Sequence, residues 1–177
     1  MQTLTQSAQV ELRSSGDMCP HMPKDRCVPA DIAKWFINRA DREAGDDMTH
    51  LKLQKLIYFA QAWHLANTGD ALFQEDMQAW THGPVVPSVW HAYKQFQWDS
   101  IPTGDDPDVD HRVAQYLELI YKNYGKYSAK ELERITHRDD PWIETRGDIP
   151  LEAACSNPIG KRLMRDFYAA RIGKSWQ

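Results

Sequence analysis

The sequence predicts a mainly α-helical fold, a single compact domain of about six helices with one short extended segment. Apolar residues recur at helical spacing through most of the chain beyond residue 28, and Pro, Gly, Ser and Thr stand where helices would begin and end. The 177 residues, 42% hydrophobic and 26% charged, suffice for a core without disulfides or metal. We therefore expect one helical domain over 29–177, preceded by a flexible arm over 1–28 that lacks periodicity.

The first two predicted helices carry the strongest helical signals of the chain. Apolar spacing and Pro29 in a first-turn position predict a helix over 30–44, which Gly45 would end. Thr49 is a suitable cap for a second helix over about 50–67, whose apolar residues we interpret as one broad stripe. Both helices are thus expected to bury one face.

A short extended segment and a proline-rich loop follow. Apolar and polar residues alternate over 77–81, which favours a strand or extended piece. The next segment, 82–88, contains Gly83-Pro84 and Pro87, which fix backbone angles and remove amide donors. We expect a rigid loop that exposes its own carbonyls.

Four helices are predicted beyond this loop. Apolar spacing predicts one over 89–96 and another over 113–121, separated by an acidic linker at 102–108. Ser128 opens a capping box for a short helix, and Asn157-Pro158 opens the last one.

A packing corner is predicted between the last two helices, over 136–142. Pro141 breaks the preceding helix there, Asp140 is placed to hold the turn, and Trp142 can fold back onto the core.

The sequence contains none of the common catalytic motifs. There is no GxSxG, no HExxH and no glycine-rich phosphate loop. His50 and His64 fall on one helix face but lie about 21 Å apart along its axis, too far to share a metal. We therefore expect no enzyme, no cofactor and no metal site. A small hydrolase or metal enzyme that uses His82, His137 and Asp140 is the lowest-ranked alternative.

The cysteines and the hydropathy favour the cytoplasm. Cys19, Cys27 and Cys155 form an odd set without CxxC spacing, which argues against a disulfide framework and a zinc ribbon. No apolar run approaches the roughly 18 residues that a membrane span needs, and the polar start lacks the features of a signal peptide. We expect a cytoplasmic protein without membrane association.

The charge distribution bears on nucleic-acid binding. A net charge of −4 leaves no overall excess of Lys and Arg for a phosphate backbone. Residues 70–110 carry eight acidic side chains and a single basic one, Lys94, whereas 151–177 are basic. A DNA-binding regulator remains an alternative, and its phosphate contacts would come from the last predicted helix: Lys161, Arg162, Arg165, Arg171 and Lys174.

Aromatic side chains supply candidate contacts for a protein partner. Trp35, Trp63 and Trp90 fall on helical apolar faces and are assigned to the core. The tryptophans that border turns are expected to be half-exposed anchors beside the rigid loop, although Val85 and Val86 could equally pin that loop to the second helix. The candidate partner-binding residues are Trp80, His82, Gly83, Pro84, Val85, Val86, Pro87, Trp98 and Trp142.

Two linked motifs carry a family resemblance. The run LKLQKLIYFAQAWH at 51–64 is followed by AW at 79–80 and HGPVVP at 82–87. With these motifs the chain resembles the Panacea domain family, the SocA-like antitoxins that include phage-associated GepA-type proteins, over about 29–170. The residues that carry the family motif in structural roles are Leu53, Lys55, Leu56, Tyr58, Phe59, Trp63, His64, His137 and Pro141.

The resemblance implies an antitoxin. Family members are typically encoded beside a toxin gene, bind the toxin protein directly and hold it inactive, and the family brings no catalytic residues. Some members are thought to deliver the toxin to a cytoplasmic protease. The sequence leaves open whether this chain masks or delivers its toxin, which toxin it binds and in what stoichiometry. The alternative is a DNA-binding regulator of its own operon or a phage-associated regulatory protein.

Overall fold

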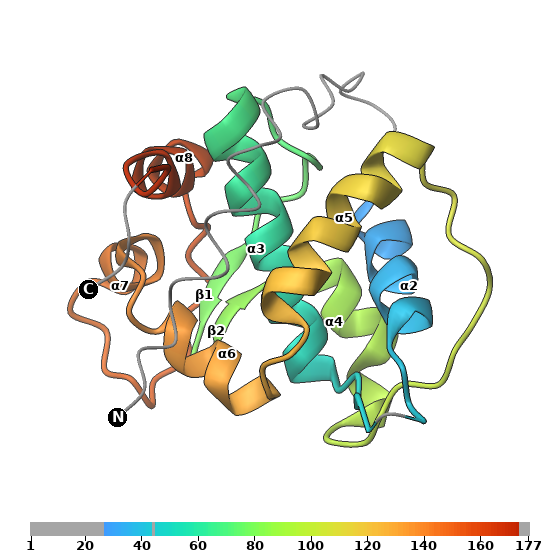
Figure 1. Cartoon of the computed structure of the whole chain (residues 1–177). Coiled ribbons are helices and arrows are strands. Elements are labelled where there is room, and N and C mark those ends of the chain that lie inside the picture. The colour runs from blue at the N-terminus through green and yellow to red at the C-terminus, as the bar shows by residue number, and fades with distance from the viewer. Residues whose placement is uncertain (1–26, 44, 174–177) are drawn as a thin grey trace, which may run out of the picture.

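The computed structural model describes residues 27–43 and 45–173. Nearly all of the predicted arm at 1–28 therefore lies outside the described residues. Within them the chain is mainly α-helical, which confirms the predicted fold class. The elements, shown in Figure 1, are α2 (Pro29–Arg39), α3 (His50–Thr68), β1 (Gln78–Trp80), β2 (Gly83–Val85), α4 (Pro87–Tyr93), the 3-10 helix η1 (Lys94–Phe96), α5 (His111–Tyr124), α6 (Ala129–Thr136), α7 (Asp140–Arg146) and α8 (Lys161–Ala169). None of the helices in this part of the chain is long and apolar enough to cross a membrane.

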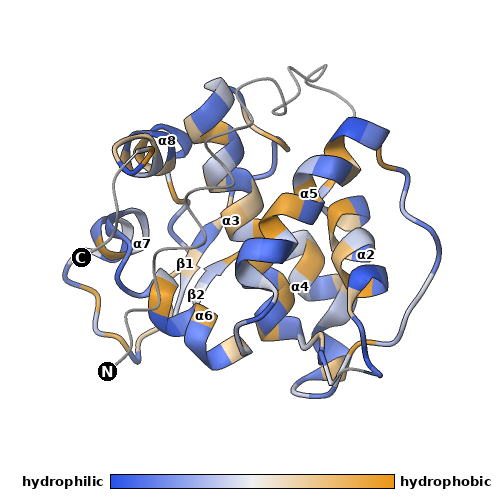
Figure 2. Ribbon diagram, viewed as in Figure 1, coloured by the Kyte–Doolittle hydropathy of each residue, from blue (hydrophilic) through white to orange (hydrophobic). Residues whose placement is uncertain are grey.

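Helix α3 is the centre of the fold. The Thr49 side chain accepts a hydrogen bond from the Lys52 amide at its start, and Gly69, with φ +80°, ends it in the left-handed region. All but a few of its residues are buried, because α2, α4, α5, α6, α8 and β2 all pack around it. The prediction of a single apolar stripe is therefore wrong. In Figure 2 the surrounding helices show the mixed hydrophobic and hydrophilic stretches of amphipathic helices.

Two buried glutamines of α3 hold neighbouring segments in place. The Gln61 amide donates to the Phe73 carbonyl at 2.8 Å, and its oxygen accepts from the Leu72 amide at 2.8 Å. Gln54 accepts from the Val86 amide at 2.8 Å. Since unpaired buried backbone groups are costly, these side chains replace the pairing that a helix or sheet would give.

The first helix is shorter than predicted. It ends at Arg39, not at residue 44. Arg42 explains the early end, because its guanidinium donates to the Ile37 carbonyl at 3.0 Å and to the Ile101 carbonyl at 2.6 Å. The side chain thereby binds a carbonyl of the last helical turn, which a longer helix would have used itself.

The predicted loop at 82–88 contains a second strand, β2, and the first residues of α4. The extended segment predicted over 77–81 contains β1, and it pairs antiparallel with Gly83–Val85 so that Ala79 faces Pro84. The carbonyl of Pro84 accepts from Lys55, so the prediction of exposed loop carbonyls is wrong there. Val86 is fully buried in the core and its amide donates to Gln54 of α3, as the alternative interpretation expected, whereas Val85 lies outside the core cluster.

The free edge of β1 pairs with the segment before α8. The Ala79 amide donates to the Asn157 carbonyl at 3.0 Å, and the Ile159 amide donates to the Met77 carbonyl at 2.7 Å. Asn157-Pro158 therefore extends along the hairpin, and α8 begins only at Lys161. The prediction that Asn157-Pro158 opens this helix is wrong, because strand-like pairing holds these residues.

The predicted corner at 136–142 leads into α7, a helix over Asp140–Arg146 that was not predicted from the sequence. Pro141 occupies its first turn. Trp142 folds back onto the core as predicted, stacks on His137 with ring centroids 4.2 Å apart, and donates to the Trp80 carbonyl at 2.9 Å. Only 3% of Trp142 is exposed, so the expectation that it is a half-exposed anchor is wrong.

Asp139 carries a buried carboxyl that joins three elements. Its Oδ2 accepts hydrogen bonds from the hydroxyls of Tyr58 on α3, at 3.1 Å, and Tyr168 on α8, at 2.5 Å. Burial raises the pKa of Asp139 from 3.8 to about 7, although the two tyrosine hydrogen bonds act in the opposite direction. The carboxyl is therefore partly protonated near neutral pH.

Replacement of Asp139 by asparagine will change the pH dependence of stability. Between pH 3.8 and about 7 the folded protein holds a proton that the unfolded chain releases. The stabilisation from Asp139 is thus fully present below pH 3.8 and is lost as the pH rises through about 7, by roughly 1.4 kcal/mol per pH unit. Asparagine does not ionise, so we expect urea unfolding at about pH 5 and about pH 8 to show the variant gaining stability relative to the wild type.

Asp148→Asn is the control, because Asp148 is an exposed aspartate just beyond the end of α7 and does not contribute to the pKa of Asp139. Its stability relative to the wild type should stay constant over the same range. A constant difference for Asp139→Asn as well would show that the buried carboxyl does not take up a proton.

Candidate functional site: an aromatic pocket

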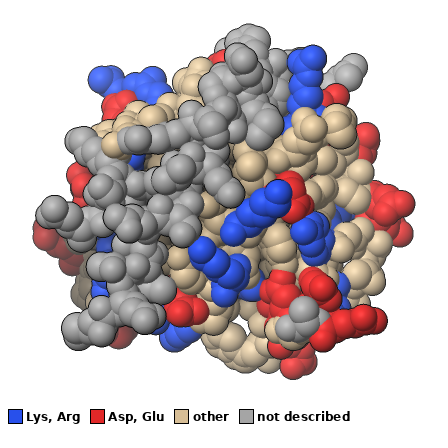
Figure 3. Space-filling view, in the orientation of Figure 1, with Lys and Arg blue, Asp and Glu red and all other residues tan. Residues whose placement is uncertain are grey.

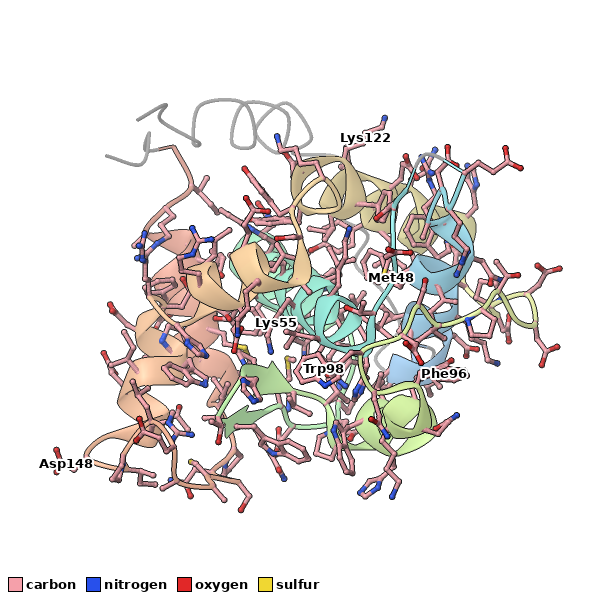
Figure 4. All side chains as sticks on the ribbon, turned by 90° about the horizontal axis from the view of Figure 1, so that it is seen from below. Met48, Lys55, Phe96, Trp98, Lys122 and Asp148 are labelled. Carbon is pink, nitrogen blue, oxygen red and sulfur yellow. The ribbon has the colours of Figure 1, made fainter. Side chains whose placement is uncertain are left out.

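A pocket with a volume of about 730 Å³ opens between the first half of α3, the β1–β2 hairpin, the α4–η1 segment and residues 154–156. Five aromatic side chains line it, and we call it the aromatic pocket: His50, Trp80, His82, Trp90 and Trp98. Most of its lining surface is apolar, and no Asp or Glu is among the lining residues. Figure 4 looks up at this side, with Lys55 and Trp98 labelled between α3, the hairpin and α4.

The aromatic rings contact one another in edge-to-face geometry. The ring centroids of Trp80 and Trp90 lie 5.3 Å apart, and those of His82 and Trp98 lie 6.4 Å apart. The His50 ring is tilted by 45° against that of Trp90, with the centroids 6.3 Å apart. Trp98 is 69% exposed, the highest value among the large hydrophobic side chains that the structure describes as exposed. The pocket is therefore preformed by ring packing on one side and open to solvent beside Trp98.

Lys55 lies beneath the pocket as a fully buried amine. Its Nζ donates to the Pro84 carbonyl at 3.0 Å, which ties the hairpin to α3. Burial lowers the pKa of Lys55 to about 7, against the opposing influence of Glu133. Burial and the nearby Lys55 also lower the pKa of His50 to about 4, so His50 is neutral at pH 7.

An ion-pair network joins one edge of the pocket to α6. The His82 Nδ1 lies 2.8 Å from one oxygen of Glu133, whose other oxygen accepts from Lys130 at 2.5 Å. Burial opposes ionisation of Glu133, but the bonds from Lys130 and His82 outweigh it, and the pKa of Glu133 is lowered. The network fixes the ring of His82, which remains more than half exposed.

The candidate partner-binding residues divide into two groups. Trp80, His82, Val85 and Trp98 line the pocket. The others are used elsewhere: Gly83, Pro84, Val86 and Trp142 are buried, and Pro87 begins α4.

The tryptophans assigned to the core also divide. Trp63 is buried as expected, whereas Trp35 and Trp90 are only partly buried. Trp90 instead serves as a wall of the pocket.

The residues of the family motif lie in the core or pack against it. His137 stacks on Trp142, and its pKa is lowered chiefly by burial. The other motif residues are buried: Leu53, Lys55, Leu56, Tyr58, Phe59, Trp63, His64 and Pro141.

The histidines considered for catalysis have separate partners. His82 bonds Glu133 and His137 stacks on Trp142, while Asp140 is an exposed residue at the start of α7. Over 27–43 and 45–173, no group of three His, Cys, Asp or Glu is placed to hold a metal ion.

Several pocket residues were not predicted from the sequence. Gln54 and Cys155 line the pocket, and Gln97 adopts a φ of +49° in its wall. Lys94 lies over the Trp90 ring with its Nζ 5.2 Å from the centroid. In the sequence, Lys94 is marked out as the single basic residue among eight acidic ones in 70–110. The sequence pattern did not indicate that it lies beside an aromatic ring.

The basic residues considered for DNA contacts, in α8 and just after it, have local partners where the structure describes them. Lys161 pairs with Asp76, and both Arg162 and Arg165 pair with Asp166. Arg171 lies over the Phe167 ring. The last candidate, Lys174, lies outside the described residues. Figure 3 shows the charged side chains of one face, with acidic residues gathered toward its lower right.

A known protein family matches the segment that builds this pocket. The family model described as "Antitoxin SocA-like, Panacea domain" matches residues 53–143, about half of the chain. The chain belongs to the SocA-like Panacea family. The matched segment of this Panacea-family chain includes most of the lining residues, from Gln54 on α3 to Trp98 after η1.

A curated relative points to the same family. The chain is 27% identical over 118 residues to Antitoxin SocA of Caulobacter vibrioides, in a match covering 58% of this chain and 63% of that protein. The chain thus spans less than two thirds of the relative's length. No solved structure matches the Panacea-family chain.

Proposed function

We propose that this chain is an antitoxin that binds a cognate toxin protein by direct contact in the cytoplasm and holds it inactive. The observation that carries the proposal is the position of the family match, because residues 53–143 supply most of the lining of the aromatic pocket. The name of the relative, Antitoxin SocA, supports the same class of function. Protein interfaces concentrate their binding energy in tryptophan and other large anchors, which this pocket presents.

The experiment is co-expression with the product of the adjacent reading frame. We expect that product to stop growth alone, and this chain to restore growth and to co-purify with it. Restored growth without a complex between the purified proteins would contradict neutralisation by direct contact, and absence of rescue would contradict the antitoxin function.

Masking and delivery to a protease differ in the lifetime of the toxin. As a further part of the proposal, neutralisation includes delivery to a cytoplasmic protease. Co-expression of this chain should then shorten the half-life of the toxin in a chase after translation is stopped. An unchanged half-life with full rescue would leave masking as the mode of neutralisation.

Trp98→Ala should weaken toxin binding without unfolding the protein. The Trp98 side chain is 69% exposed, so its removal costs the free protein little packing, whereas a tryptophan anchor contributes about 2 kcal/mol or more to an interface. We expect Kd for the toxin to rise about thirtyfold, with Tm changed by less than about 2 °C. Titration calorimetry and thermal unfolding measure the two effects.

Ile172→Ala is the control for Trp98→Ala, because it also removes an exposed large hydrophobic side chain, just beyond the end of α8. It should leave Kd unchanged. Equal effects of the two variants, or a parallel loss of Tm and binding for Trp98→Ala, would remove Trp98 from the proposed contact.

A further inference from the structure

We infer that the aromatic pocket receives one apolar side chain of the toxin that stands beside a carboxylate, with Lys94 as the cation that binds the carboxylate. The inference rests on the proposed function, and it specifies the chemistry of the toxin segment that enters the pocket. The apolar side chain is inferred from the tryptophans that line the pocket, and the carboxylate is inferred from Lys94 at the rim, where the pocket opens to solvent.

The walls of the pocket are suited to an apolar side chain. Trp80, Trp90 and Trp98 line it, and most of the lining surface is apolar. The volume of about 730 Å³ is large enough to take up a bulky side chain together with part of its backbone. Because Trp80 and Trp90 already pack edge to face, binding of an apolar side chain requires little rearrangement of these rings.

Lys94 supplies the positive charge at the rim. It is the single Lys or Arg between residues 70 and 110. Its ammonium lies over the ring of Trp90, at 5.2 Å from the centroid, and none of the ion pairs among the described residues includes it. A carboxylate bound there would be the first anionic partner of an ammonium already oriented by the ring.

The lower part of the pocket adds little fixed charge. His50 is neutral at pH 7 because burial lowers its pKa to about 4. Burial lowers the pKa of the Lys55 amine to about 7, so it is only partly charged at pH 7, and it already donates to the Pro84 carbonyl. Selectivity for charge therefore lies at the rim, while the interior favours an apolar group.

A cationic occupant fits less well. Aromatic rings attract Arg and Lys, but Lys94 already occupies a face of Trp90, and the lining contains no carboxylate to balance a second cation. The acidic residues that neighbour the pocket in sequence do not line it. Charge complementarity thus favours an acidic partner segment at this position.

The exposed Trp98 directly follows a residue in a strained backbone conformation. Gln97 adopts φ +49° and ψ −106°, a backbone conformation that non-glycine residues seldom occupy. Such strain is found mainly where a binding or catalytic site maintains it. In this chain it follows η1 directly and immediately precedes the large exposed ring at the open side of the aromatic pocket.

The test is charge reversal at the rim, with the adjacent-gene toxin as the probe. Lys94→Glu should raise Kd for the toxin by about tenfold or more, while Lys122→Glu, the same change at an exposed lysine of α5, should alter it by less than about twofold. Figure 4 shows Lys122 at the upper edge of the view, away from Trp98 near its centre. Lys94→Gln should also remove most of the increase in Kd between about 50 mM and about 500 mM NaCl.

A complementary change in the toxin identifies the carboxylate. Each Asp and Glu of the toxin is replaced by Lys, and we expect one replacement to weaken binding to the wild-type chain and to restore binding to Lys94→Glu. An unaffected or smaller Kd for Lys94→Glu overturns the inference, as does the absence of any rescuing replacement. If the wild-type chain forms no complex and gives no rescue of growth, the proposed function itself fails, which is a different outcome.

Discussion

Gly83→Ala will lower the free energy of unfolding by about 3 kcal/mol or more, one of the two largest effects that we expect. Gly83 has φ +97°, which residues with side chains rarely adopt, and it begins β2, which packs against α3 and α6. A Cβ there would come within 2.8 Å of both the Lys55 Nζ and the Thr136 Oγ1. Because Lys55 and Thr136 are fully buried, neither can move aside without disturbing the core.

Gly69→Ala is the control that measures the cost of a positive φ without a steric clash. Gly69 also has a positive φ, of +80°, but no atom lies within 4 Å of the position that its Cβ would take. Urea unfolding should give a loss of about 1 kcal/mol for Gly69→Ala. Equal losses for the two variants would show that the approach of Gly83 to Lys55 and Thr136 does not constrain the fold.

Arg146→Met will lower the free energy of unfolding by about 4 kcal/mol. The guanidinium of Arg146 is buried and donates to the carbonyl of Ala79 on β1, at 2.9 Å. It also donates to the carbonyls of Pro150, Leu151 and Ala153. Methionine keeps the packing of the long stem but leaves these oxygens without their donor.

Arg112→Met, at an exposed position of α5, is the control for this change and should cost less than about 0.5 kcal/mol. Arg146→Met should also weaken toxin binding, because the chain held at 150–153 leads into the pocket wall at 154–156. A loss similar to that of Arg112→Met would mean that Arg146 does not hold this wall.

Much of the fold was predictable because local signals and packing agree. Thr49 and Ser128 cap helices as their sequence contexts predict, with the full capping box at Ser128. The predictions failed where a contact with a residue far along the chain determines the local backbone structure. Arg42 ends α2 early, and the edge of β1 holds Asn157-Pro158 in an extended conformation.

The central position of α3 had a signal in the sequence that the stripe interpretation overlooked. Apolar residues occur on every side of this helix, which is the pattern of a buried helix, and its polar residues Gln54, Lys55 and Gln61 interrupt that pattern. Their hydrogen bonds to segments far along the chain explain why they are buried. Periodicity alone does not reveal such partners.

The site was predictable in part. The sequence places Trp80, His82 and Trp98 beside turns, and the structure brings them to one pocket. The contribution of Trp90, Lys94 and residues 154–156 depends on how α4 and the segment before α8 meet the hairpin, which no local pattern encodes. Trp142 folds back onto the core as predicted but is not half-exposed, because its indole donates to the Trp80 carbonyl, 62 positions away in the sequence.

The central claim is that this chain neutralises a toxin by direct contact at the aromatic pocket, and hydrogen exchange tests it most directly. Exchange of the backbone amides is compared for the full chain alone and with the product of the adjacent gene. We predict slower exchange in the complex at the segments that line the pocket: 50–55, 80–82, 90–98 and 154–156. Protection confined to α8 or to other distant elements, or no protection at any segment, would contradict the account.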